Sequence, residues 1–291
     1  MIRHAWALPL LAILLGCHSS PERDIPSARL PNRIVSTAPS ITETLYQLGL
    51  GDRVVGVSRF CVYPPEATEK TNVGGLLDPN LEVLVGLQPD LVILLDSAGP
   101  LRDGIEKLGI PHLSVNNRTV DDVFESFRLI GHTCGVEREA GELIRNLRGR
   151  IASVKEKTKD RSRPRVLFVV SRLLDSGDIR DVYVAAEDGY FSRLLALAGG
   201  ENACPAGSET FPVVSVEGLL RMNPDVILDA SFTTGSSAGE SATQALDDWK
   251  SLPTLAAVKN GRVHALEEDF ARIPGPRFVL LLERMAELIG D

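Results

Sequence analysis

The sequence predicts an α/β fold of two similar lobes, each with a short parallel sheet, joined by one long interdomain helix. Short β-branched runs alternate with amphipathic helical stretches from residue 32 onward, which is typical of α/β layers. A unit made of a short helix, a Pro-Asp turn and an apolar strand occurs twice, 135 residues apart. Between the two copies, residues 136–157 form one uninterrupted amphipathic helical pattern.

The first 17 residues predict a targeting segment. Arg3 and His4 precede an apolar run at 5–15, which is shorter than the roughly 20 residues that a membrane span requires. The run ends in Leu-Leu-Gly-Cys at 14–17, which looks like a bacterial lipobox, so we expect Cys17 to be lipidated. The alternative is an ordinary signal peptide with a fortuitous cysteine. Residues 18–31 contain three prolines and are expected to form a flexible tether.

The first lobe, residues 32–135, is predicted to contain alternating strands and helices. Its first helix has a defined start, because it follows Pro39 and carries Ser40 and Glu43 at the spacing of a capping box. Strands are expected at 33–36, 53–57, 91–95 and 112–115, and helices at 40–48, 80–86 and 101–108.

The second lobe, residues 161–291, repeats this plan. Leu-Glu-Val-Leu at 81–84, followed by Pro-Asp at 89–90, corresponds to Val-Glu-Gly-Leu at 216–219, followed by Pro-Asp at 224–225. Two lobes with matched plans favour a ligand site between them. Strands are expected at 165–170, 226–228 and 262–265, and helices at 189–198, 215–222 and 275–289.

The segment 136–160 is predicted to connect the lobes as a stiff helix. Its apolar residues fall on one face, and about 22 residues give a rod of roughly 33 Å, long enough to cross between lobes. A surface helix packed on a single lobe is the alternative. One stiff connector implies a small hinge motion on ligand binding.

Composition excludes several classes of function. The net charge is −8, which argues against nucleic acid or an anionic membrane surface as a partner.

Loss of the leader leaves three cysteines, Cys61, Cys134 and Cys204, which allow one disulfide in an oxidising compartment without indicating the pair. Each is otherwise expected to be a small buried side chain.

The sequence lacks the common motifs of enzymes and metal sites. The sequence contains no Gly-x-Ser-x-Gly, P-loop or His-Glu-x-x-His motif, and the histidines after the leader are far apart in sequence. We therefore expect no catalytic residue, no resident cofactor and no metal bound directly by the chain. A chelate-processing enzyme and a scaffold lipoprotein with a vestigial cleft are the alternatives from other functional classes.

Four segments, in this order and together with the connecting helix, resemble a known family. They are Arg-Ile-Val-Ser-Thr-Ala-Pro-Ser-Ile-Thr-Glu at 33–43, Val-Val-Gly-Val-Ser-Arg-Phe-Cys-Val-Tyr-Pro-Pro at 54–65, Val-Gly-Gly at 73–75 and Pro-Gly-Pro-Arg at 274–277. The chain is similar over about residues 32–290 to the class III periplasmic binding proteins for vitamin B12, haem and ferric siderophores. The resemblance implies an exported, monomeric receptor that gives its ligand to the permease dimer and ATPase subunits of an ABC importer, with a lipid anchor as its only membrane contact.

The resemblance also assigns site residues. Glu82 and Glu217 fall where each lobe of such proteins docks on the permease. Phe60, Phe211 and Asp269 fall where B12-binding members line their cleft. Leu76 and Leu95 stand where rings are common, and Arg272 directly precedes Ile273, which replaces the first arginine of Arg-Pro-Gly-Pro-Arg. Tyr63 and Tyr190 are expected either to add polar contacts to the ligand or to be packed in the core.

A cobalamin-type corrinoid is the ligand that these positions favour. Aromatic faces suit a flat macrocycle, and a carboxylate suits the amides of a corrin. A ferric siderophore or haem is the alternative, and would favour several cleft arginines or an axial Tyr or His, respectively.

Overall fold

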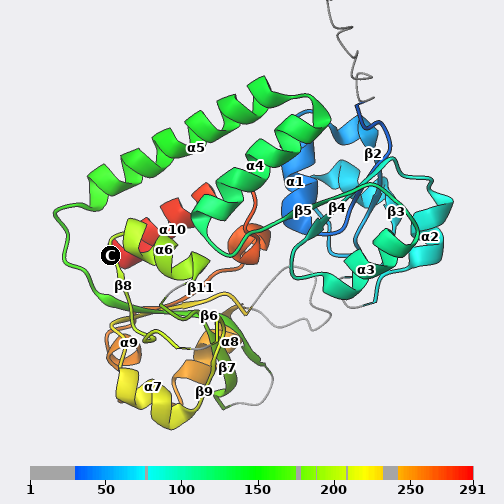
Figure 1. Ribbon diagram of the computed structural model, residues 1–291. Helices are drawn as coiled ribbons and strands as arrows, with labels where there is room; N and C mark the ends of the chain where they lie inside the picture. The colour runs from blue at the N-terminus through cyan, green and yellow to red at the C-terminus, as the bar shows by residue number, and fades with distance from the viewer. Residues whose placement is uncertain are drawn as a thin grey trace, which may run out of the picture.

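Two sheets, one in each lobe, form the frame of the chain (Figure 1). The structure is a computed structural model that describes residues 30–75, 78–174, 178–187, 189–207, 209–231 and 242–290, without the side chains of 242–245. The predicted leader, Cys17, most of the tether and Leu76 lie outside the described residues.

The first lobe contains a five-stranded parallel sheet with the order β3-β2-β1-β4-β5. The four strands expected from the sequence are present within one residue of their predicted bounds. The strands are β1 (Ile34–Ser36), β2 (Val54–Val57), β3 (Thr71–Asn72), β4 (Leu91–Leu95) and β5 (His112–Val115). The helices are α1 (Pro39–Gln47), η1 (Gly51–Arg53), η2 (Pro65–Glu69), α2 (Leu81–Gly86), α3 (Gly99–Lys107) and α4 (Val120–Cys134). The capping box expected at Ser40 and Glu43 is wrong, because α1 begins one residue earlier with Ala38 as its N-cap and without a side-chain cap among the described residues.

The second sheet has the order β11-β10-β6-β7-β9, and β8 pairs with the start of β6. Strands β11, β10 and β6 are parallel as expected, whereas β7 runs antiparallel to both β6 and β9. The strands are β6 (Arg165–Leu173), β7 (Arg180–Val184), β8 (Glu201–Asn202), β9 (Val213–Val214), β10 (Val226–Asp229) and β11 (Val263–Ala265). The helices are α6 (Tyr190–Leu197), α7 (Val216–Met222), α8 (Ala242–Trp249), α9 (Ala256–Lys259), η3 (Asp269–Arg272) and α10 (Phe278–Gly290).

The internal repeat extends to hydrogen bonds. In the first lobe, the carboxylate of Asp90 accepts from the backbone N–H of Arg33 at 2.8 Å. In the second lobe, the carboxylate of Asp225 accepts from the backbone N–H of Arg165, also at 2.8 Å. Each bond connects the Pro-Asp turn to the start of the neighbouring strand, so the two lobes share this hydrogen-bonding arrangement.

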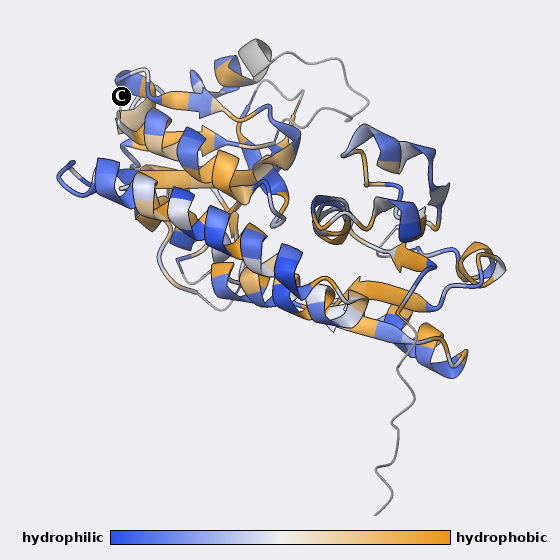
Figure 2. Cartoon of the chain, turned by 90° about the horizontal axis from the view of Figure 1, so that it is seen from above, coloured by the Kyte–Doolittle hydropathy of each residue, from blue (hydrophilic) through white to orange (hydrophobic). Residues whose placement is uncertain are grey.

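Helix α5 (Glu137–Thr158) packs on the cores of both lobes. Ala140 belongs to the core cluster of the first lobe, Leu147 and Val154 belong to that of the second, and Leu143 packs against both. The helix has 22 residues and starts one residue later than predicted. Figure 2 shows hydrophilic colour along its outer face and hydrophobic colour in the sheets, as expected for an amphipathic connector.

Helix α4, which the sequence analysis did not predict, shares this bridging role. Phe124 and Phe127 in its first half lie in the second lobe's core, while Ile130 lies in that of the first. A Cβ on Gly131 would lie 2.5 Å from the Cβ of Ala140, so glycine permits the close packing of α4 on α5. The connection is therefore a pair of packed helices, and the boundaries at residues 135 and 160 stay a prediction.

Within the described part of the chain, none of the helices has both the length and the hydropathy that crossing a bilayer would require.

Candidate functional site

An arginine joins the two lobes at their junction. Arg277, just before α10, donates to both carboxylate oxygens of Glu43 at 3.0 and 2.7 Å. The same guanidinium donates to both oxygens of Asp269 at 2.8 and 2.9 Å. Glu43 lies on α1 of the first lobe and Asp269 on η3 of the second, so one cation holds an acid from each lobe.

The cluster is largely buried, so its charged groups lose hydration and must be paired. The side chain of Glu43 is 2% exposed and that of Arg277 is 13% exposed. Burial raises the pKa of Glu43, and the hydrogen bonds and charge of Arg277 only partly oppose that effect. Burial alone would lower the pKa of Arg277, but its two carboxylate partners outweigh burial and raise that pKa. The guanidinium therefore stays charged, and Glu43 depends on it for its own ionisation.

Two aromatic rings flank the same guanidinium. The Cζ atom of Arg277 lies 3.7 Å from the ring centroid of Tyr63, which follows β2, and 5.4 Å from that of Phe270 on η3. Cations at this range are attracted to the faces of aromatic rings. Tyr63 and Asp269, both predicted ligand residues, are thus brought together, and Arg277 is the residue that unites them.

Phe60 and Phe211 are exposed aromatic side chains, one on each lobe. Phe60 is 57% exposed after the carboxyl end of β2, and Phe211 is 43% exposed just before β9. The centroid of the Phe211 ring lies 6.1 Å from that of the buried Phe191, so Phe211 packs against the core of the second lobe. Open α/β sheets bind ligands beyond the carboxyl ends of their strands, which is where Phe60 lies.

Tyr190 does not lie where the ligand prediction put it. Its side chain is 4% exposed, and its ring packs edge-on against Phe191 and Phe278 at centroid distances of 5.0 and 6.5 Å. Burial raises the pKa of its hydroxyl well above the ordinary range, and that hydroxyl has no hydrogen-bond partner among the described residues. The residue fills the core of the second lobe, so of its two expected roles buried packing is the one found, and the ligand contact is wrong.

Two further predicted positions are partly buried. Leu95 packs against the core cluster of the first lobe. Arg272 reaches the backbone oxygen of Val170 at 3.5 Å, and burial lowers the pKa of its guanidinium.

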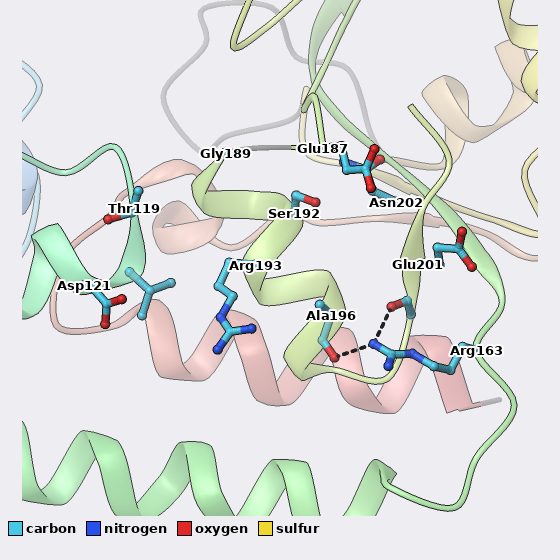
Figure 3. Close-up of a pocket in the computed structure, with 12 residues that line it drawn as sticks. Thr119, Asp121, Arg163, Glu187, Gly189, Ser192, Arg193, Ala196, Glu201 and Asn202 are labelled. Atoms are coloured by element: carbon cyan, nitrogen blue, oxygen red, sulfur yellow. Dashed lines mark hydrogen bonds between the residues drawn. The ribbon is translucent and has the colours of Figure 1, made fainter. Parts of the chain in front are cut away.

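Recesses on the described surface include two of several hundred Å³. One of about 610 Å³ lies beside Tyr63 and has Glu66 and Glu69 among its lining residues. The other, of about 700 Å³, lies on the second lobe where α6 meets the start of α4 (Figure 3). Arg163 closes one side of the second recess by donating to backbone oxygens of α6 and the turn after it, at 3.1 and 3.3 Å. Phe60 and Phe211 line neither recess, so a cleft between the lobes stays a prediction.

Glu82 and Glu217 lie in the first turns of α2 and α7, which begin in the same way. Asn80 and Ser215 each accept a hydrogen bond from the backbone N–H three residues later, at 3.1 and 3.2 Å. Both glutamates are exposed, and Glu217 pairs with Arg221 at 2.9 Å.

The comparisons identify the family. The family model described as "Periplasmic binding protein" matches residues 34–270. The chain belongs to this family. It is 31% identical over 273 residues to the uncharacterized ABC transporter substrate-binding lipoprotein YvrC of Bacillus subtilis, covering 92% of this chain and 83% of that protein.

Solved structures agree with this assignment. The periplasmic vitamin B12-binding protein BtuF of Vibrio cholerae is 25% identical with a TM-score of 0.76, covering 89% of this chain and 96% of that one. The periplasmic heme-binding protein RhuT of Roseiflexus is 27% identical with a TM-score of 0.76, covering 89% and 98%, respectively. The chain is a substrate-binding protein of an ABC transporter, a solute receptor and not an enzyme.

The three cysteines in the described part of the chain, Cys61, Cys134 and Cys204, are free and buried. Cys61 accepts a hydrogen bond from Thr42 at 3.1 Å, and burial raises the pKa of its thiol. Burial likewise raises the pKa of Cys134, to about 11. The disulfide that the composition allowed is therefore absent. Among the described residues, no group of three or more His, Cys, Asp or Glu side chains is arranged to hold a metal ion.

Sequence reasoning missed Arg277 as a site residue, although it noted the Pro-Gly-Pro-Arg segment that carries it. The signal available in the sequence was an arginine two residues after Gly275. The structure adds that this glycine packs on α1. A Cβ on Gly275 would lie 3.2 Å from Glu43 Oε2, so the segment approaches α1 closely.

Proposed function

We propose that this receptor captures a cobalamin-type corrinoid between its two lobes and delivers it to the permease of an ABC importer. The observation that carries the proposal is the exposure of one aromatic ring from each lobe, Phe60 and Phe211. Exposed rings of this size gain free energy when a flat macrocycle covers them. The vitamin B12-binding protein of Vibrio cholerae has the same fold, which supports the same class of ligand here.

The charge of the junction favours a corrinoid over an anionic chelate. Arg277 is neutralised by Glu43 and Asp269, so this cluster carries no net positive charge. Arg59, next to Phe60, is paired with Asp78. A ferric catecholate carries several negative charges and needs unpaired cations around it, whereas the amides of a corrin need acceptors such as carboxylates.

Haem is the second candidate. Tyr63 is 41% exposed and stands against Arg277, and a phenol is a known axial ligand of haem iron. The heme-binding protein of Roseiflexus has the same fold, which gives this alternative its support.

The attachment of the receptor and its docking complete the proposal. Cys17 is proposed as the lipidated residue that anchors an exported, monomeric receptor, and a relative named as a lipoprotein supports this. Glu82 and Glu217 are proposed to dock on basic residues of the two permease subunits. Their matched positions on α2 and α7 suit a partner with two-fold symmetry.

A titration panel tests the ligand. The receptor without its proposed anchor, residues 18–291, is titrated by calorimetry with cyanocobalamin, haemin and a ferric catecholate. Trp249, the one tryptophan left after the leader is removed, is 1% exposed, so calorimetry is a better readout than intrinsic fluorescence. We expect submicromolar binding of cyanocobalamin. Submicromolar binding of haemin or of the catecholate, with none of cyanocobalamin, would overturn the corrinoid assignment.

A transport assay tests the docking residues. The Glu82→Ala, Glu217→Ala double variant is expected to keep its affinity for ligand but to lose uptake through the cognate importer. Glu125→Ala is the matched control, since Glu125 is exposed and pairs with an arginine one turn later, as Glu217 does. Uptake equal to wild type in the double variant rejects the role of the two glutamates.

A further inference from the structure

Helices α2 and α7 match one another beyond their glutamates. Two positions after each glutamate, a leucine points into the core of its lobe, and Leu84 and Leu219 are both 0% exposed. The next residue is again aliphatic in both helices, but it points outward. Val85 is 43% exposed and Leu220 is 42% exposed.

The helical period places these exposed side chains beside the glutamates. Residues three apart lie on the same face of a helix, with Cβ atoms about 5–6 Å apart. Val85 is three residues after Glu82, and Leu220 is three residues after Glu217. Each lobe therefore presents an acidic and an aliphatic side chain next to each other, opposite the buried leucine.

A single exposed aliphatic residue is common on protein surfaces and carries no meaning by itself. Here the same combination occurs at the same position of both lobes, with nearly equal exposure, on helices that share their N-capping geometry. On α7 the apolar area is extended by Val216, which is four residues before Leu220 and is 38% exposed. Such a repeated combination fits a partner that offers two similar contact sites.

We propose that Val85 and Leu220 are aliphatic anchors of the importer-docking surface. Each fits an apolar recess next to a basic side chain on one subunit of the permease dimer. This inference rests on the proposed docking role of Glu82 and Glu217. The two kinds of residue have separate tasks: the acids steer the negatively charged receptor to the permease, and the anchors slow its dissociation.

The kinetics of binding to the importer separate these tasks. The ligand-loaded receptor is passed over its cognate importer in lipid nanodiscs, and association and dissociation rates are measured at several salt concentrations. We expect Val85→Asn and Leu220→Asn each to speed dissociation about tenfold, and the double variant about a hundredfold. Their association rates and salt dependence should equal those of wild type.

Leu108→Asn is the matched control, because Leu108 is an aliphatic residue at the end of α3 that is 50% exposed. It should bind the importer as wild type does. The Glu82→Gln, Glu217→Gln variant should associate more slowly and lose much of its salt dependence.

The outcomes distinguish the two proposals. If the Val85→Asn, Leu220→Asn double variant dissociates at the wild-type rate while the glutamine variant associates slowly, the anchor role is rejected and the docking role of the glutamates stands. Wild-type kinetics of the glutamine variant overturn the docking role on which the anchors rest. Dissociation speeded equally by Leu108→Asn overturns the anchors as specific sites. A wild-type receptor that dimerises in sedimentation through Val85 and Leu220 overturns the permease as their partner.

Discussion

Replacing Arg277 by methionine should destabilise the receptor strongly, because Glu43 is then left buried without its cation. The carboxylate of Glu43 is 2% exposed and accepts two hydrogen bonds from Arg277. Removing one partner of a buried ion pair costs about 3–5 kcal/mol. Methionine is unbranched and fills part of the volume of the arginine side chain, but it lacks the guanidinium that lies over Tyr63, so the loss includes this cation–π contact as well as the ion pair.

The pH dependence of this loss follows from the pKa of Glu43. Burial already raises that pKa with Arg277 in place, and removing the guanidinium removes the contacts that lower it. Above about pH 4.3 the unfolded glutamate is ionised, whereas the folded one in the variant still holds its proton. The stability of Arg277→Met therefore falls as the pH rises through this window, and its deficit should be smaller at pH 5 than at pH 8.

Urea unfolding followed by circular dichroism measures both effects. Arg150→Met is the matched control, since Arg150 makes two hydrogen bonds with Glu283 but both side chains are more than one-third exposed. It should cost at most about 1 kcal/mol. In a Glu43→Gln background the loss from Arg277→Met should shrink by at least about 1.5 kcal/mol. Additive effects of the two substitutions, or a deficit that grows on acidification, would refute this reasoning.

Two other buried groups give predictions of the same kind. Burial raises the pKa of Cys134 to about 11, so stability should be lost as the pH rises from about 9 to 11, by up to about 3 kcal/mol more in wild type than in Cys134→Ala. A difference between the urea midpoints of the two proteins that is the same at pH 8 and at pH 11 would contradict this. Asp229→Ala removes the acceptor shared by Arg172 Nε and Trp249 Nε1–H, both at 2.9 Å in a fully buried site, and should cost about 3–5 kcal/mol with a red shift of tryptophan emission. An unshifted emission maximum in a folded variant would contradict the placement of the indole.

The sequence predicted the strands and helices with strong periodic patterns. β1, β4 and β10 are buried apolar runs next to turn residues, and α5 has a long amphipathic stripe, so local pattern and tertiary role agree. Strands β3, β8 and β9 have two residues each and are too short to form a pattern, because their pairing depends on neighbouring strands. α4 was missed although its capping box between Thr119 and Asp122 was a readable signal.

The site was less predictable than the fold. Tyr63 and Asp269 were selected by resemblance, but their common partner could not be found from spacing, since Arg277 and Glu43 are 234 residues apart. For Tyr190 the sequence left a ligand contact and core packing open, because Tyr190 and Phe191 start a helix with two adjacent rings and the sequence does not say which of them faces outward. In the structure both are buried at 4% exposure.

One ligand is proposed to bind between the two lobes through groups from both. Calorimetric titration of cyanocobalamin into wild type, Phe60→Ala and Phe211→Ala measures whether both lobes contribute. We expect one binding site per chain and an affinity that falls about tenfold or more in each variant, because each ring covers one face or edge of the same macrocycle. Binding that depends on only one of the two rings, or on neither, would contradict a shared site.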